Sequence, residues 1–169
     1  MNRTMSNLAT MALMFVSTSA LAAIEGTMYK NPGCACCDKH AAYLRKNGFN
    51  IKIVEHKDLP SLRRAKGIPS LLDGCHTIII GNYIVEGHVP AAPIKRMLAE
   101  RPSIKGISVP GMPAGSPGME HDGDHEHAEH GAAKPPTAKK LTANKPVVLQ
   151  VYKIAPGEPK VYSTENYSG

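Results

Sequence analysis

The sequence predicts a mixed α/β fold built on one sheet with both parallel and antiparallel strands. Between residues 25 and 102, short apolar segments with strand-like alternation are interleaved with segments of helical periodicity. A Cys-x-x-Cys pair, Cys34 and Cys37, stands where the first predicted strand gives way to the first predicted helix. The last of the four cysteines, Cys75, directly precedes a later strand. Together these observations indicate a fold that presents thiols at the start of a helix.

The predicted elements follow the order β-α-β-α-β-β-α. They lie at residues 27–29, 36–46, 49–55, 58–66, 76–80, 83–86 and 91–100. Asn47-Gly48 ends the first helix, Asp58 caps the second, and Pro90 opens the third. Gly81-Asn82 joins the two adjacent strands and is a hairpin signal.

A parallel crossover pair followed by an antiparallel hairpin and a last helix is the layout of the thioredoxin and glutaredoxin folds. In that layout the first strand delivers the Cys-x-x-Cys pair to the N-terminus of the first helix, where the helix dipole and free amides favour thiolate. The third strand begins beside this point. The predicted fold therefore brings Cys75 close to Cys34, Cys36 and Cys37.

The chain divides into four predicted parts. Residues 1–23 have the features of a secretory signal peptide, with Arg3, an apolar stretch and a small-residue cleavage site, so we expect an exported, periplasmic protein. Residues 24–119 form the thioredoxin-like domain. Residues 120–146 form the third part, which is expected to be flexible. The wider segment 103–146, which includes the end of the domain, is rich in Gly, Pro, Ala and His and is expected to bury little. Residues 147–162 return to strand-like alternation and are expected to pack on the domain.

Charge and hydropathy argue against two classes of partner. The chain carries 20 basic and 14 acidic residues, a formal net charge of +6. The basic residues are dispersed without interleaved aromatic residues, which indicates a solvated surface rather than a nucleic-acid interface. No second long apolar run follows the signal segment, so we expect no membrane insertion once the signal is removed.

The cysteine cluster is the main functional signal. Cys34, Cys36 and Cys37 place three thiols within four residues, and adjacent cysteines form a disulfide with each other only with strain. A soft-metal site or a dithiol/disulfide site explains this spacing. The alternative is two structural disulfides, as in many exported proteins, but this leaves the neighbours Cys36 and Cys37 poorly accommodated.

Four segments of the sequence form a distinctive set of motifs: Tyr29-Lys-Asn-Pro-Gly-Cys-Ala-Cys-Cys37, Gly74-Cys-His-Thr77, Glu86-Gly-His-Val-Pro90 and Gly111-Met-Pro-Ala-Gly-Ser-Pro-Gly-Met119. Together, in this order, they resemble the CopG-type periplasmic copper-resistance proteins. The family is thioredoxin-like, exported and implicated in copper handling through its cysteines. The chain departs from the family pattern at Ala35 and His40, and neither change removes a sulfur.

The resemblance implies copper as the bound metal. Cu(I) is soft and prefers two or three thiolates, so four converging thiolates offer more sulfur than one ion uses. We therefore expect a polynuclear, cysteine-bridged Cu(I) site held by Cys34, Cys36, Cys37 and Cys75. Whether bound copper cycles between Cu(I) and Cu(II), and whether the protein is an enzyme, are left open. The rival site is structural zinc bound by the same four thiolates.

Methionine and histidine residues are secondary candidates. Met112 and Met119 lie in a Gly/Pro-rich loop that either supplies thioether ligands or a lid over the site, or packs as an ordinary loop. The tract with His121, His125, His127 and His130 either holds divalent metal loosely or is a solvated linker. The family match includes His88, which makes it a ligand candidate, whereas His76 is expected to be structural. His40 and His56 are expected at the surface.

Three functions are consistent with these features. The first is a copper-binding protein that confers copper tolerance, with copper ions and other periplasmic copper-handling proteins as partners. The second is a thiol-disulfide oxidoreductase in which Cys34 attacks and Cys37 resolves. The third is a structural zinc or disulfide module. Cys36 separates the first two, because an oxidoreductase needs only the outer pair.

Overall fold

The computed structural model describes residues 22–120 and 146–168. The predicted signal peptide and the predicted flexible segment therefore lie almost entirely outside the described residues, as do His121, His125, His127 and His130. The described residues form seven strands, three α-helices and one short 3-10 turn. In chain order these are β1 (Ile24–Lys30), α1 (Ala35–Lys46), β2 (Phe49–Glu55), α2 (Leu59–Lys66), η1 (Ser70–Leu72), β3 (Thr77–Ile80), β4 (Tyr83–Gly87), α3 (Ala91–Glu100), β5 (Gly106–Val109), β6 (Val147–Ile154) and β7 (Lys160–Tyr167).

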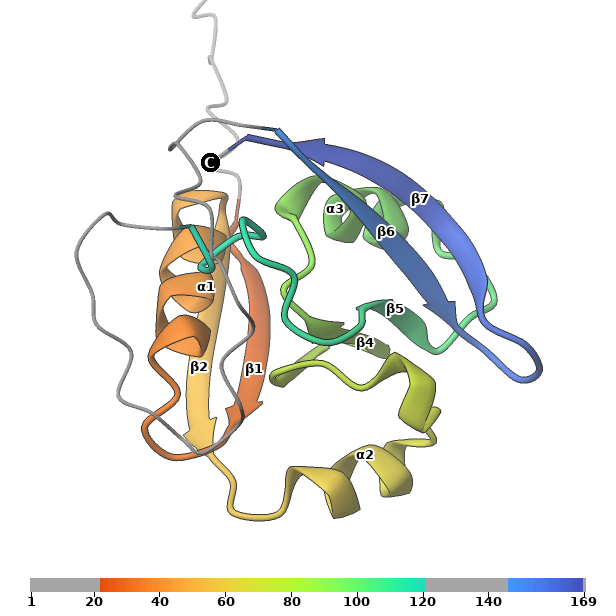
Figure 1. Ribbon diagram of the computed structural model, residues 1–169, viewed down its shortest axis with the longest axis horizontal. Helices are drawn as coiled ribbons and strands as arrows, with labels where there is room; N and C mark the ends of the chain where they lie inside the picture. The colour runs from red at the N-terminus through yellow and green to blue at the C-terminus, as the bar shows by residue number, and fades with distance from the viewer. Residues whose placement is uncertain (1–21, 121–145, 169) are drawn as a thin grey trace, which may run out of the picture.

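All seven strands belong to one mixed sheet in the order β2-β1-β3-β4-β5-β6-β7 (Figure 1). β1 pairs in parallel with β2, and β4 pairs in parallel with β5, while the other neighbours are antiparallel. The predicted mixed α/β class is confirmed. The identity of the fold as thioredoxin-like or glutaredoxin-like stays a prediction.

Local sequence explains why these elements form. In β2, Phe49 and Ile51 are buried while their neighbours Asn50 and Lys52 are exposed, the alternation of a strand with one face on the core. The buried residues of α1 follow the i, i+3, i+4, i+7 pattern, which places them on one face of the helix: Cys37, His40, Ala41 and Leu44. The Asp58 side chain accepts a hydrogen bond from the Ser61 amide at 3.0 Å, as a helix cap does.

One prediction about burial is wrong. Residues 103–146 were expected to bury little, yet all four residues of β5 are buried between β4 and β6. The strand is short and stands among Gly and Pro residues, so the composition of this segment indicated a loop. Within the strand, Ile107 and Val109 alternate with Gly106 and Ser108 as a strand requires. β5 also connects the C-terminal hairpin to the rest of the sheet, because β6 pairs with it.

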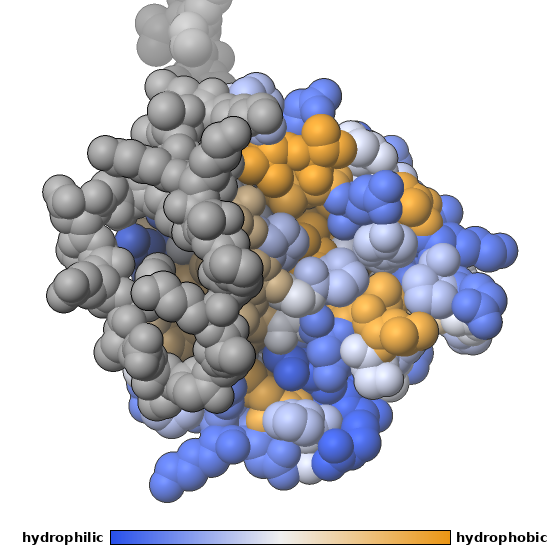
Figure 2. Space-filling model, viewed as in Figure 1, coloured by the Kyte–Doolittle hydropathy of each residue, from blue (hydrophilic) through white to orange (hydrophobic). Residues whose placement is uncertain are grey.

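Hydrophobic side chains gather in patches on the face shown in Figure 2. A groove of about 530 Å³ is lined by η1, the end of β5, the loop that follows and β6, with the residues Leu71, Leu72, Val109, Pro110, Pro113, Val148, Leu149, Gln150, Tyr152 and Pro159. No cysteine is among these described lining residues, so the groove is separate from the cysteine cluster. Across the described part of the chain, every helix is too short or too polar to cross a membrane.

Candidate metal centre

Three of the four cysteines, Cys34, Cys36 and Cys37, lie at the start of α1. Gly33 takes a positive φ of 73°, which turns the chain out of β1, and Cys34 then occupies the N-cap position. Cys36 and Cys37 follow in the first helical turn, where backbone amides have no partner within the helix and favour negative charge. The buried Lys30 ammonium, 3.1 Å from the Asp38 carboxylate, ties the end of β1 to this turn.

Cys75 reaches the cluster because two glycines allow strands to approach closely. A Cβ atom on Gly74 would lie 2.5 Å from the Cα atom of Gly87, so any side chain at position 74 would force the two segments apart. This contact holds the residues just before β3 against the end of β4. This close approach explains why a glycine, Gly74, stands directly before Cys75 and another, Gly87, stands directly before His88.

A buried ion pair fixes the same segment. The Glu86 side chain is fully buried and accepts hydrogen bonds from Arg63 Nε at 2.7 Å, from the Gly74 amide at 2.8 Å and from Thr77 Oγ1 at 2.6 Å. Arg63 also donates to the Gly74 carbonyl at 2.6 Å. The network positions the backbone next to Cys75. Sequence reasoning missed it, because Arg63 looked like one of many surface charges on a short helix.

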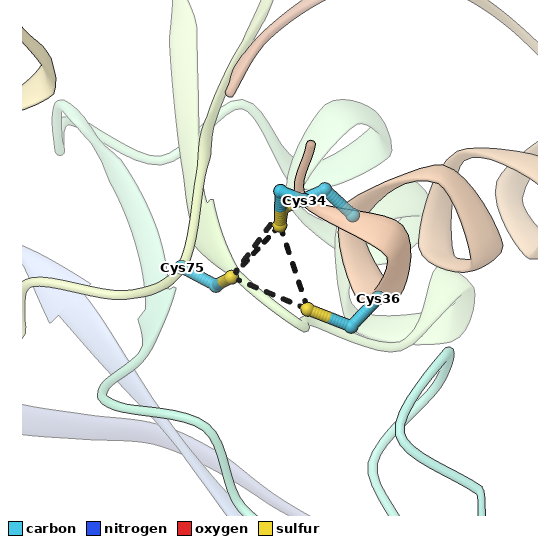
Figure 3. A group of neighbouring side chains, drawn as sticks. Cys34, Cys36 and Cys75 are labelled. Atoms are coloured by element: carbon cyan, nitrogen blue, oxygen red, sulfur yellow. Dashed lines mark hydrogen bonds between the residues drawn. A yellow bond between two sulfur atoms is a disulfide. The ribbon is translucent and has the colours of Figure 1, made fainter. Parts of the chain in front are cut away.

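The four sulfur atoms converge on one point. The Cys75 Sγ atom lies 3.4 Å from that of Cys34 and 3.5 Å from that of Cys36 (Figure 3). It also lies 3.3 Å from the Sγ atom of Cys37. All four Sγ atoms lie within 4.8 Å of one another. Cys34 and Cys37 form a disulfide, and Cys36 and Cys75 are free thiols. The cysteines that the sequence predicts to meet do lie together, in an oxidised state that leaves two thiols free.

The two free thiols share one proton. The hydrogen bond from Cys75, together with the nearby His88 imidazole, lowers the pKa of Cys36 to about 4 against the ordinary 9.0, although burial opposes this shift. The hydrogen bond to Cys36 and burial raise the pKa of Cys75. Cys36 is therefore a thiolate at neutral pH and Cys75 keeps its proton. A thiolate is the form of cysteine that binds metal.

Three buried histidines lie directly behind the sulfurs. His40, His76 and His88 are each 0 % exposed, and their ring centroids are 4.8 to 5.1 Å apart. The expectation that His40 lies at the surface is wrong. Burial lowers the pKa of His40 to about 3 and that of His76 well below its usual range, so both rings are neutral.

A loop from the matching segment 111–119 covers this region. His88 Nδ1 donates to the Pro117 carbonyl at 2.8 Å. Gly118 has a φ of 83°, and a Cβ atom there would lie 2.6 Å from the backbone nitrogen of His40, so the loop rests directly on α1. Met112 is 60 % exposed and Met119 is partly buried. The loop packs on α1, and both a lid role and thioether ligation by Met112 and Met119 stay predictions.

Two signals in the sequence point to the histidine group. Cys36 and His40 are four residues apart on α1, so they share one face of the helix. The hairpin pairs Thr77 with Glu86, and continuing this register by two residues places Cys75 opposite His88. The same continuation sets His76 beside them.

Comparisons with known proteins agree with these features. A family model described as "Protein of unknown function, DUF411" matches residues 72–119. Two solved structures named "Copper resistance protein copG", Form 2 and Form 1, are each 29% identical to this chain with a TM-score of 0.65. They cover 85% and 86% of this chain, and 98% and 99% of their own chains. No curated protein matches the chain.

Proposed function

This chain belongs to the CopG-type family, and on that basis we propose that it is a periplasmic copper-binding protein that confers copper tolerance. The observation that carries the proposal is the convergence of four sulfur atoms within 4.8 Å. Thiolates are the preferred ligands of Cu(I), and one Cu(I) ion uses only two or three of them. The ligands are Cys34, Cys36, Cys37 and Cys75, and together they hold more than one ion through bridging sulfurs.

The disulfide between Cys34 and Cys37 supports a further step in which the site reduces copper. Each of these two residues, as a thiolate, gives one electron to a Cu(II) ion. The two thiolates then form the S–S bond, and the two metal ions become Cu(I). A two-electron dithiol reductant restores the thiolates and completes the cycle. In this scheme Cys36 and Cys75 keep their free thiols and retain copper while the other pair is oxidised.

The same disulfide favours a second candidate function, thiol-disulfide exchange. It joins the N-cap of α1 to the first helical turn, the position where an attacking thiolate is stabilised. Exchange needs Cys34 and Cys37 alone. It gives no role to Cys36 or to Cys75, although both lie within 3.5 Å of the pair.

Copper content separates the functions. Protein reduced before copper loading should bind more than one Cu(I) per chain, and Cys36→Ser should remove several ions at once because a bridging sulfur holds more than one. One zinc or copper ion per chain, unchanged by Cys36→Ser, would exclude the bridged copper site and favour structural zinc. Ser61→Ala, a change on α2 outside the cysteine cluster, is the control and should leave the copper content unchanged.

A further inference from the structure

The loop that follows β5, here called the covering loop (residues 111–119), touches the backbone of both free cysteines. At its start, Gly111 forms a bridge with Gly74, which directly precedes the cysteine next to β3. Near its end, a Cβ atom on Gly118 would lie 2.9 Å from the carbonyl oxygen of Cys36. The covering loop therefore runs from one side of the cysteine cluster to the other.

Hydrogen bonds within the covering loop give it a fixed internal shape. The Ser116 amide and hydroxyl donate to the Pro113 carbonyl at 3.1 Å and 2.7 Å. The Gly115 amide donates to the Met119 carbonyl at 3.1 Å, and the Met119 amide donates to the Ser116 carbonyl at 2.7 Å. A contact that holds the end of such a loop therefore controls the position of the rest.

The last strand of the sheet supplies that contact. Glu120 directly follows the covering loop, and its Oε2 atom accepts a hydrogen bond from the Gly118 amide at 2.7 Å. Its Oε1 atom accepts one from the Tyr167 hydroxyl at 2.6 Å, although Tyr167 stands 47 positions further along the chain. The Tyr167 ring packs edge-on against Tyr43 of α1, with the ring centroids 5.8 Å apart. One carboxylate thus joins the loop to β7, and the tyrosine ring joins the end of β7 to α1.

The neighbouring strand meets the same loop. A Cβ atom on Gly115 would lie 2.5 Å from the Cγ2 atom of Val147, the first residue of β6. The hairpin of β6 and β7 therefore contacts the covering loop at two points. The second point, at Tyr167, is the last residue of a strand that pairs with β6 alone in the described sheet. The end of an edge strand near a chain terminus opens more readily than the core.

We propose that Glu120 and Tyr167 form a latch that holds the covering loop closed over the cysteine cluster and sets the rate at which copper enters and leaves. The proposal rests on the proposed function for the identity of the cargo. Opening breaks the hydrogen bond between the two side chains and lifts Gly118 from α1. It needs only the end of β7 to separate, so β5 and the rest of the sheet stay paired.

A latch of this kind changes exchange rates without changing affinity. Glu120 and Tyr167 lie outside the group of four cysteines, so copper meets the same sulfur ligands whether the loop is open or closed. A weaker latch makes the open loop more frequent in the free and in the loaded protein alike. The rates of copper uptake and release should then rise by the same factor, and their ratio should stay the same.

Transfer of Cu(I) to a chelator tests the latch. Reduced, full-length protein loaded with Cu(I) is mixed with bathocuproine disulfonate, at concentrations where the rate no longer depends on the chelator. Tyr167→Phe keeps the ring and loses the hydroxyl, so it should speed copper release about 3- to 30-fold with unchanged affinity. Tyr162→Phe is the matched control on the same strand, because its hydroxyl donates to Glu100 at 2.9 Å, outside the loop. Its release rate should equal that of the wild-type protein.

Hydrogen exchange in metal-free protein tests the latch without copper. The Gly118 amide should exchange about 3- to 30-fold faster in Tyr167→Phe than in the wild type. The double variant with Glu120→Ala should release copper no faster than Glu120→Ala alone, because both changes break the same bond.

An unchanged release rate in Tyr167→Phe would overturn the latch. Faster release with an equal loss of affinity would also overturn it, because the change would then act on the sulfur ligands themselves. Wild-type protein that binds no Cu(I) would refute the proposed function, while faster exchange at Gly118 in Tyr167→Phe would still support the latch.

Discussion

The thiol of Cys36 should react as a thiolate in mildly acidic solution. Its pKa is lowered to about 4, chiefly by the hydrogen bond from Cys75 at 3.5 Å and then by His88. The thiolate is therefore present above about pH 4 and is lost as the pH falls through that value. At pH 6 an ordinary thiol with a pKa near 9.0 is ionised to about one part in a thousand, while Cys36 is almost fully ionised.

The assay is alkylation by iodoacetamide of metal-free protein that keeps the Cys34–Cys37 disulfide. The labelling rate of each thiol is followed by peptide mass spectrometry between pH 3 and pH 9. The rate for Cys36 should reach half of its plateau near pH 4, and Cys75 should remain almost unlabelled because its pKa is raised. The pH range in which Cys36 labels and Cys75 does not spans neutrality.

The Cys75→Ala variant identifies the cause. Alanine has no donor for the Cys36 thiolate, so the midpoint for Cys36 should rise by at least about one pH unit. A midpoint near pH 8 to 9 in the wild-type protein, or one that is the same in both proteins, would refute the account of a shared proton.

Three further predictions concern the surroundings of the site. Glu86→Ala should lower the free energy of unfolding of the metal-free protein by about 3–5 kcal/mol, because it leaves the buried Arg63 without its carboxylate; a loss below about 1 kcal/mol in urea unfolding would contradict this. Gly118→Ala should cost about 1–3 kcal/mol in the same assay, since φ is 83° and the new Cβ would meet the backbone of α1; an unchanged midpoint would show that the loop does not rest there. Deletion of residues 121–130 should leave thiolate-bound Cu(I) intact and weaken uptake of divalent copper, and loss of the core copper would show that the tract is part of the main site.

Local patterns predicted the helices and most strands because each depends on nearby residues. Alternation in β2, the Asp58 cap and the Gly81-Asn82 hairpin are all readable within a few positions. β5 was missed because four residues are too few to show a period, and its burial depends on β6, about 40 residues further along the chain. Strand length and partners are set by the whole sheet.

The candidate metal centre was likewise predictable from the sequence only in part. Convergence of the cysteines followed from the predicted fold, since a Cys-x-x-Cys pair at the start of a helix and a cysteine before the third strand meet in that layout. His40 was misplaced because one histidine on a helix gives no sign of which neighbours cover it. The Arg63–Glu86 pair joins α2 to β4 across 23 residues, and such a pair has no local signature in the sequence. Contacts between distant segments are what the structure adds.

Copper binding by Cys75→Ser tests the central claim most directly, because Cys75 has no part in exchange between Cys34 and Cys37 but is a copper ligand in the proposed function. The measurement compares bound Cu(I) per chain in reduced wild-type protein and in the variant, alongside the rate at which each metal-free protein reduces a model disulfide. The account predicts that the variant loses most of its copper and that the wild-type protein reduces disulfides poorly. A variant with its full copper content, together with brisk disulfide reduction by both proteins, would contradict it and identify the chain as a thiol-disulfide oxidoreductase.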